Sequence, residues 1–360
     1  MNSEDQVPSE GSAGVDRATL LRRLAIGGAA LSIPALATAQ EAFGASAAGG
    51  GGNYPSHPKW KFAFVNHVTT NPFFVPTQYG AADACALVNC SYTWGGSEKA
   101  DVGEMLNAFN SAVSAKSDGI AVCVVDKAAF EAPIKQALGK GIPVLAYNAD
   151  GARTGPKNRM AYIGQALYES GFAMGQRIAT LVPKGDVALF IATPGSLNIQ
   201  PRIDGAIDTI KKSGKGITYH TIATGAAVPK ELSTIDAYWL GHKDTKGMFA
   251  VDAGSTQGVA QVIKKYNLSG KVRGGGYDLL TPTIELLQAG QIDFTIDQQP
   301  YLQGFLPVLE LYMYKASQTL TGLADVNTGL KFLDKTTVKP YVTTKSRYEG
   351  SSTAAGVTSS

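Results

Sequence analysis

Polar and aromatic side chains follow nearly every β-strand that this 360-residue chain is expected to form, each at the carboxyl end of its strand. Planar amides, carboxylates and guanidinium groups pair with neighbouring hydroxyls, and flat rings cover the C–H face of a pyranose or polyol. The chemistry that such a set favours is the binding of a sugar or a sugar alcohol. The residues expected to contact this ligand are His67, Asn71, Phe73, Phe74, Trp94, Asp126, Asn148, Asn198, Arg202, Asp252, Tyr277, Asp278 and Gln298.

The segment Asn71-Pro72-Phe73-Phe74 stands where the first strand gives way to a helix. Residues 62–65 are apolar or small and strand-length, so they are expected to form a strand buried on both faces. Pro72 occupies the first helical position, where its missing N–H costs nothing. One ring is expected in the core and the other against a ligand; the alternative is that both rings are core.

The carboxylates have an alternative role as well. Asp126 and Asp252 each stand where a helix N-cap is expected, and an aspartate there accepts a hydrogen bond from the first turn of the helix. The argument for a site therefore rests on the whole set rather than on any one residue.

Strands and helices alternate from residue 61 onward, which predicts a doubly wound parallel sheet, and the pattern restarts after residues 162–164. One α/β unit is thus built twice. Strands are predicted at 62–65, 88–92, 119–125, 142–147, 187–191, 217–222, 247–251, 271–277 and 294–296, and helices at 72–87, 100–116, 128–138, 167–181, 202–212, 234–240, 256–266, 282–288 and 302–320.

The first 57 residues are predicted to be an export signal and a flexible lead-in. Arg22-Arg23 precedes an apolar run over 24–39, and 37–39 or 45–47 fits a small-x-small cleavage site. The paired arginines favour the twin-arginine route. The run is shorter than the ~20 residues that a membrane span needs, which argues against a retained anchor. The expected location is the periplasm.

The three cysteines leave two interpretations open. In an exported protein Cys85 and Cys90 could form a disulfide, whereas Cys90 and Cys123 also fall in or beside apolar strands and suit buried free thiols.

Several functional classes are disfavoured. The net charge is +3 and no basic run exceeds two residues, so nucleic acid is not an expected partner. No G-x-G-x-x-G follows the first strand, and both a serine nucleophile elbow and H-E-x-x-H are missing. The chain is therefore predicted not to be an enzyme, with no cofactor and no metal ion.

Seven short motifs occur in a fixed order. They are Asn-Pro-Phe-Phe at 71–74, Gly-Ile-x5-Asp at 119–126, Gly-Ile-Pro-Val at 141–144, Arg-x-x-Gly at 202–205, Phe-Ala-x-Asp at 249–252, Gly-Tyr-Asp at 276–278 and Thr-Ile-x-Gln at 295–298. Over residues 60–335 the chain resembles the type I periplasmic binding proteins for ribose, galactose, inositol and related sugars. A regulator with the same two-lobe fold would need an N-terminal DNA-binding module, where this chain has an export signal.

The resemblance implies two doubly wound lobes joined by a three-strand hinge, with a sugar clamped between them. The N-terminal lobe would comprise 58–163 plus 298–331, the C-terminal lobe 164–297 plus 332–345, and 346–360 a disordered tail. The protein would be a monomer that delivers its ligand to the membrane permease of an ABC transporter. The alternative is a periplasmic sensor that presents the sugar to a chemoreceptor or a sensor kinase.

The resemblance also assigns roles. Asn71, Phe73 and Phe74 match the amide and the stacking rings, Gln298 matches a hinge-side glutamine, and Arg202 matches an arginine that forks onto ring hydroxyls. Arg202 is expected to contribute most to binding, with Asp252 and Asp278 holding its guanidinium group. The alternative is that Arg202 only caps a helix or forms a salt bridge within its own lobe, near Asp204. Three departures leave the sugar open among pentoses, hexoses, inositols and sugar alcohols. Asn148-Ala149 replaces Asp-Arg, His67 replaces a small hydroxyl residue, and Ala253-Gly254 follows Asp252 where a longer acidic pair is common.

Overall fold

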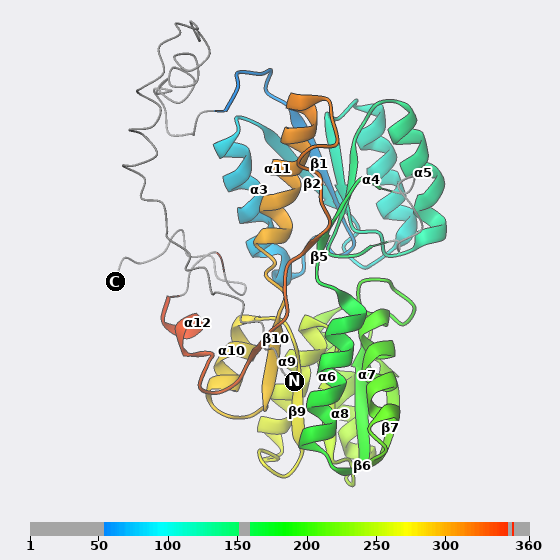
Figure 1. Cartoon of the computed structure of the whole chain (residues 1–360). Helices are drawn as coiled ribbons and strands as arrows, with labels where there is room; N and C mark the ends of the chain where they lie inside the picture. The colour runs from blue at the N-terminus through cyan, green and yellow to red at the C-terminus, as the bar shows by residue number, and fades with distance from the viewer. Residues whose placement is uncertain (1–53, 151–158, 345–347, 349–360) are drawn as a thin grey trace, which may run out of the picture. The chain divides into compact units, whose positions relative to one another are not determined.

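A computed structural model describes residues 54–150, 159–344 and 348 of the chain. These residues form two six-stranded sheets, each flanked by helices (Figure 1). The export signal and its cleavage sites, and all of the predicted tail except Tyr348, lie outside the described residues. No helix within the described ranges is long and apolar enough to cross a membrane.

The first lobe is built on a sheet in which every neighbouring pair is parallel. Its strand order is β11 (Val326–Asn327), β5 (Tyr162–Gly164), β4 (Val144–Tyr147), β3 (Gly119–Val122), β1 (Lys61–Asn66) and β2 (Ser91–Gly96). Its helical segments are η1 (Pro72–Phe74), α3 (Val75–Leu87), α4 (Val102–Ser114), α5 (Lys127–Gly139) and α11 (Leu302–Ser317).

The second lobe repeats this plan, except that its edge strand β12 runs antiparallel to β10. Its strand order is β12 (Lys331–Leu333), β10 (Phe294–Asp297), β9 (Arg273–Tyr277), β8 (Gly247–Ala250), β6 (Lys184–Ile191) and β7 (Gly216–Ala223). Its helices are α6 (Leu167–Leu181), α7 (Gln200–Lys212), α8 (Val228–Gly241), α9 (Ala253–Lys265), α10 (Thr281–Gln288) and α12 (Lys339–Thr344). The two-lobe fold predicted from the sequence is therefore confirmed.

The chain passes between the two sheets at three places. It leaves the first sheet after β5 and the second after β10, and it returns to the second between β11 and β12. Lys331, expected as the last residue of the first lobe, is the first residue of β12 in the second sheet. The third passage is thus residues 328–330.

Two pairs of helices approach closely enough to require glycine. A Cβ at Gly304 of α11 would lie 1.8 Å from the carbonyl oxygen of Thr77 in α3, and one at Gly171 of α6 would lie 2.1 Å from the carbonyl oxygen of Arg202 in α7. Glycine therefore lets these backbones pack directly on each other. The second contact also holds the backbone of Arg202 close to helix α6.

Several element boundaries differ from those predicted, each for a local reason. The strand predicted at 88–92 begins only at Ser91, because Asn89 adopts a left-handed φ of 52° after α3. The strand predicted at 119–125 leaves its ladder after Val122, although residues 123–125 remain buried. Helix α8 begins six residues earlier than predicted, and Pro229 stands in its first turn.

All three cysteines are free and buried. Burial raises the pKa of the Cys85 thiol to about 12, that of Cys90 to about 11 and that of Cys123 to about 12. The structure therefore agrees with buried free thiols and not with a disulfide between Cys85 and Cys90.

Candidate functional site

One cavity is lined by residues that follow strands of both sheets. It encloses about 330 Å³ of space, which is partly open to solvent. Ten of the thirteen predicted site residues line it: His67, Asn71, Phe73, Phe74, Asn148, Asn198, Arg202, Asp252, Asp278 and Gln298. That these side chains bind a ligand stays a prediction.

The first-lobe wall is aromatic. Asn71 caps η1 by accepting a 2.9 Å hydrogen bond from the Phe73 backbone N–H, which fixes the start of the segment. The Phe73 and Phe74 rings meet edge to face at 4.7 Å, and the His67 ring meets Phe74 in the same way at 5.3 Å. Both phenylalanines are buried and both line the cavity, so the expected division into one core ring and one ligand ring stays a prediction.

Two buried polar atoms in this wall have no partner among the described residues. They are Nδ1 of His67 and Oδ1 of Asn148, whose Nδ2 donates to Gln303 Oε1 at 3.0 Å. Burial lowers the pKa of His67 to about 4, so its imidazole is neutral at pH 7. Since buried polar groups are rarely left unpaired, these two atoms are unusual features of the wall.

Arg202 dominates the second-lobe wall. Its side chain is almost fully buried; Nε donates to Gln165 Oε1 at 3.1 Å and Nη1 donates to the Val251 carbonyl at 2.8 Å. The guanidinium carbon lies 4.1 Å from the centroid of the Tyr277 ring. The expectation that Asp252 and Asp278 hold the guanidinium group of Arg202 is wrong. The Gln165 amide, the Val251 carbonyl and the Tyr277 ring hold it.

Two carboxylates complete the wall. Asp252 caps α9 by accepting from the Ser255 N–H at 2.9 Å, and it also accepts from the Ala192 N–H at 2.9 Å. Burial raises its pKa, and these N–H groups partly offset that effect. Asp278 accepts from Gln298 Nε2 at 2.7 Å, and burial raises its pKa to about 7 against the opposing charge of Arg202.

A third buried carboxyl group stands behind Asp252 and was missed in the sequence. Glu231 is only 2% exposed, and burial together with the charge of Asp252 raises its pKa to about 9. Its Oε2 has no partner among the described residues and would lie 1.6 Å from a Cβ at Gly254. Because helix α8 was predicted to start at residue 234, Glu231 was assigned to a loop. The cavity also includes Ile199 and Ala253, which carry no polar signal in the sequence.

Three predicted site residues do not line the cavity. Trp94 donates its indole N–H to the Thr69 carbonyl at 3.2 Å and packs on Phe74 from behind. Asp126 is exposed and caps α5 through the Ala129 N–H at 3.0 Å, as its alternative role predicts. Tyr277 is fully buried and supports Arg202.

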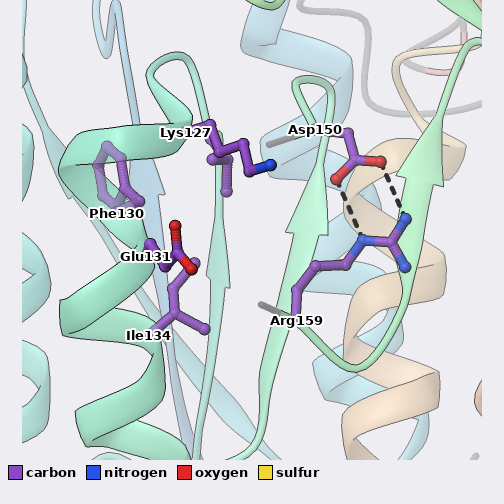
Figure 2. Close-up of a pocket in the computed structure, with 7 residues that line it drawn as sticks. Lys127, Phe130, Glu131, Ile134, Asp150 and Arg159 are labelled. Carbon is purple, nitrogen blue, oxygen red and sulfur yellow. Dashed lines mark hydrogen bonds and ion pairs between the residues drawn. The ribbon is translucent and has the colours of Figure 1, made fainter. Parts of the chain in front are cut away.

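Asp150, which follows β4, serves an ion pair elsewhere. Figure 2 shows it beside a smaller hollow lined by α5 side chains, with its carboxylate facing the guanidinium of Arg159. Arg159 donates to both Asp150 oxygens at 3.1 and 2.9 Å and to Asp325 at 2.7 and 3.1 Å. The pair therefore ties the end of β4 to the segment before β11.

Metal chemistry has no support in the described ranges, where no group of three or more His, Cys, Asp or Glu side chains could hold an ion. The cavity instead offers hydrogen-bond donors and acceptors beside two aromatic rings.

Known proteins share this architecture. A family model described as "Periplasmic binding protein domain" matches residues 62–319. The xylose/arabinose-binding protein XylF of Sulfolobus acidocaldarius is 51% identical over 321 residues, covering 86% of this chain and 79% of the relative. A solute-binding protein of an ABC transporter from Burkholderia graminis C4D1M, solved with D-arabinose, has a TM-score of 0.72 at 26% identity, covering 79% of this chain and 98% of that one.

A carbohydrate transporter protein from Acidothermus cellulolyticus 11B, solved with myo-inositol, has a TM-score of 0.70 at 28% identity, covering 79% of this chain and 96% of that one. These relatives are solute-binding proteins, which confirms the prediction that the chain is not an enzyme. The chain belongs to the periplasmic binding protein family and has the type I, sugar-binding form that its motifs predicted.

Proposed function

We propose that the protein captures a monosaccharide, foremost a pentose such as xylose or arabinose, in the cavity between its two lobes. The observation that carries this proposal is the convergence of ten predicted side chains on one cavity. The 51% identical relative is a xylose/arabinose-binding protein, and a structural neighbour was solved with D-arabinose. Both point to a pentose.

The chemistry of the walls fits a neutral polyhydroxylated ring. Phe73 and Phe74 provide an apolar surface for its C–H groups, while Arg202 donates and Asp278 accepts from the opposite side. Two of the five Arg202 N–H groups are used within the second lobe, which leaves three for hydroxyl oxygens.

The proposal extends to location and partner. The segment around Arg22-Arg23 directs export, by the twin-arginine route, and the monomeric mature protein delivers its sugar to the membrane permease of an ABC transporter. Family membership and the relatives named for ABC transport support this role.

Titration calorimetry on the mature protein tests the ligand. D-xylose and D-arabinose are expected to bind more tightly than galactose, ribose or myo-inositol. In thermal unfolding, a ligand at 100 times its Kd stabilises the protein by about 2.7 kcal/mol. Tighter binding of a hexose or an inositol would overturn the pentose assignment, and binding of none of these ligands would overturn sugar capture.

Gene deletion tests the role in the cell. Loss of labelled pentose uptake is expected if the protein serves a permease. Intact uptake with a lost transcriptional or chemotactic response would instead identify the sensor.

A further inference from the structure

Two direct hydrogen bonds join the lobes beside the cavity. The Leu197 N–H, in the loop between β6 and α7, donates to the Val125 carbonyl of the first lobe at 2.9 Å. The next residue, Asn198, places its Nδ2 3.0 Å from His67 Nε2. A polar side chain of the second lobe thus contacts the only histidine that lines the cavity.

The Asn198 amide contacts a serine of its own loop as well as His67. Its Oδ1 lies 2.6 Å from Ser196 Oγ, which donates to it, and its NH2 group faces His67. An amide NH2 group can only donate a hydrogen bond. With the amide in this orientation His67 Nε2 accepts, and the single ring proton of a neutral imidazole then sits on Nδ1.

The other side of the imidazole is unsatisfied. His67 is 8% exposed, its Nδ1 has no partner among the described residues, and its ring forms part of the cavity wall against Phe74. The charged groups that share this cavity are Arg202, Asp252 and Asp278. A buried N–H group left without an acceptor is unfavourable. Nδ1 has less than 1 Å² of exposed surface, so a ligand oxygen reaches it when the cavity wall adjusts around the ligand.

We propose that Asn198 is a positioning residue that sets the tautomer of His67 across the cleft, so that His67 presents Nδ1–H as a donor to a hydroxyl oxygen of the bound sugar. This inference rests on the proposed sugar capture. The low pKa of His67, caused by burial, agrees with a neutral ring. The proposal also gives the contact between Asn198 and His67 a role in ligand recognition.

A requirement on the ligand follows. The oxygen that faces His67 must accept, and a ligand group that reaches Asn148 Oδ1 must donate, because that amide oxygen is also buried without a partner. A hydroxyl group does both, whereas a hydrogen at the same carbon does neither. The site should therefore reject the pentose that lacks the hydroxyl facing His67.

Nitrogen-15 NMR of the ligand-free protein tests the tautomer directly. In the wild type, His67 is expected to be neutral and protonated on Nδ1. In Asn198→Asp a carboxylate that can only accept replaces the donor, so His67 should become protonated on Nε2, alone or on both nitrogens. The control is His220→Gln, which removes an exposed imidazole on β7 and should leave the His67 signals unchanged. A neutral wild-type His67 protonated on Nε2, or an unaltered His67 in Asn198→Asp, would overturn the proposal.

Two substitutions of His67 separate its nitrogens. Nδ1 lies two bonds from Cβ, as the amide nitrogen of asparagine does, and Nε2 lies three bonds away, as in glutamine. His67→Asn thus keeps a donor for the ligand, and His67→Gln keeps an acceptor for Asn198. We expect His67→Gln to weaken pentose binding at least about tenfold.

A panel of deoxypentoses completes the test. His67→Gln should no longer distinguish the pentose from the deoxy form that the wild type rejects, whereas His67→Asn should still do so. Wild-type affinity and discrimination in His67→Gln would overturn the proposal. If the wild type binds no sugar, sugar capture fails, and the ligand-free spectrum still decides the tautomer.

Discussion

Asp278→Asn should stabilise the ligand-free protein increasingly as the pH rises. Asp278 is only 4% exposed, and burial raises the pKa of its carboxyl group from 3.8 to about 7, since the charge of Arg202 and the hydrogen bond from Gln298 offset burial only in part. Between these values the native state binds more protons than the unfolded state. The free energy of unfolding therefore falls as the pH rises through this window.

The magnitude follows from the same values. A pKa difference between 3.8 and about 7 corresponds to about 4 kcal/mol, at about 1.36 kcal/mol per pH unit. Between pH 5 and pH 8 the penalty on the wild type grows by about 3 kcal/mol. Asparagine does not titrate, its Oδ1 can still accept from Gln298, and it tolerates the φ of 75° at this position. The advantage of the variant should grow by that amount.

Urea unfolding of both proteins at pH 5, 6, 7 and 8 measures this difference. A gap that stays constant across the series would show that Asp278 is ionised throughout and would refute the argument from burial.

The same substitution should weaken pentose binding by about 1.5–3 kcal/mol, because an NH2 group replaces a charged acceptor. Calorimetry at pH 8 measures that loss, and unchanged affinity would remove Asp278 from the site.

Three further predictions concern other parts of the molecule. Arg202→Ala should lower both pentose affinity, at least about tenfold, and stability, by about 3 kcal/mol for two hydrogen bonds to a charged group; an unchanged melting temperature would contradict its structural contacts. Gly254→Ala should cost about 1–3 kcal/mol in chemical denaturation because its Cβ would overlap Glu231, whereas the control Gly139→Ala has open space and should cost nothing. Replacing Arg22-Arg23 with two lysines should block export in a cell-fractionation assay, and normal export would identify the general secretory route.

The repeated α/β architecture could be predicted from the sequence because each of its signals is local. Continuous apolar runs such as 119–125 predict buried parallel strands, and glycines such as Gly141 mark helix ends. The short strands β11 and β12 carry too few residues for a pattern. They exist because each finds the open edge of a sheet formed by distant residues.

The site was predictable in part for a related reason. Carboxyl ends of parallel strands meet at one edge, so residues such as Asn71 and Asp278 converge even though they are far apart in the chain. The direction of a side chain is not local, however. Trp94 lies within β2 and Tyr277 is the last residue of β9, and their rings pack on Phe74 and Arg202 instead of lining the cavity. Glu231 was missed because its position depends on a glycine twenty-three residues later.

The late position of α11, β11 and β12 in the chain has a consequence for biosynthesis. The first lobe is completed by α11, whose Gly304 packs directly on α3, and by β11 at residues 326–327. A ribosome-bound chain ending before residue 302 would thus expose the face of α3 that α11 covers. Neither lobe can complete its fold while only its first segment has been translated. Contacts between residues that are far apart in the chain also slow folding. Export of a folded protein would have to wait until nearly the whole chain has left the ribosome, and a nonsense mutation before residue 326 should leave both lobes without an edge strand.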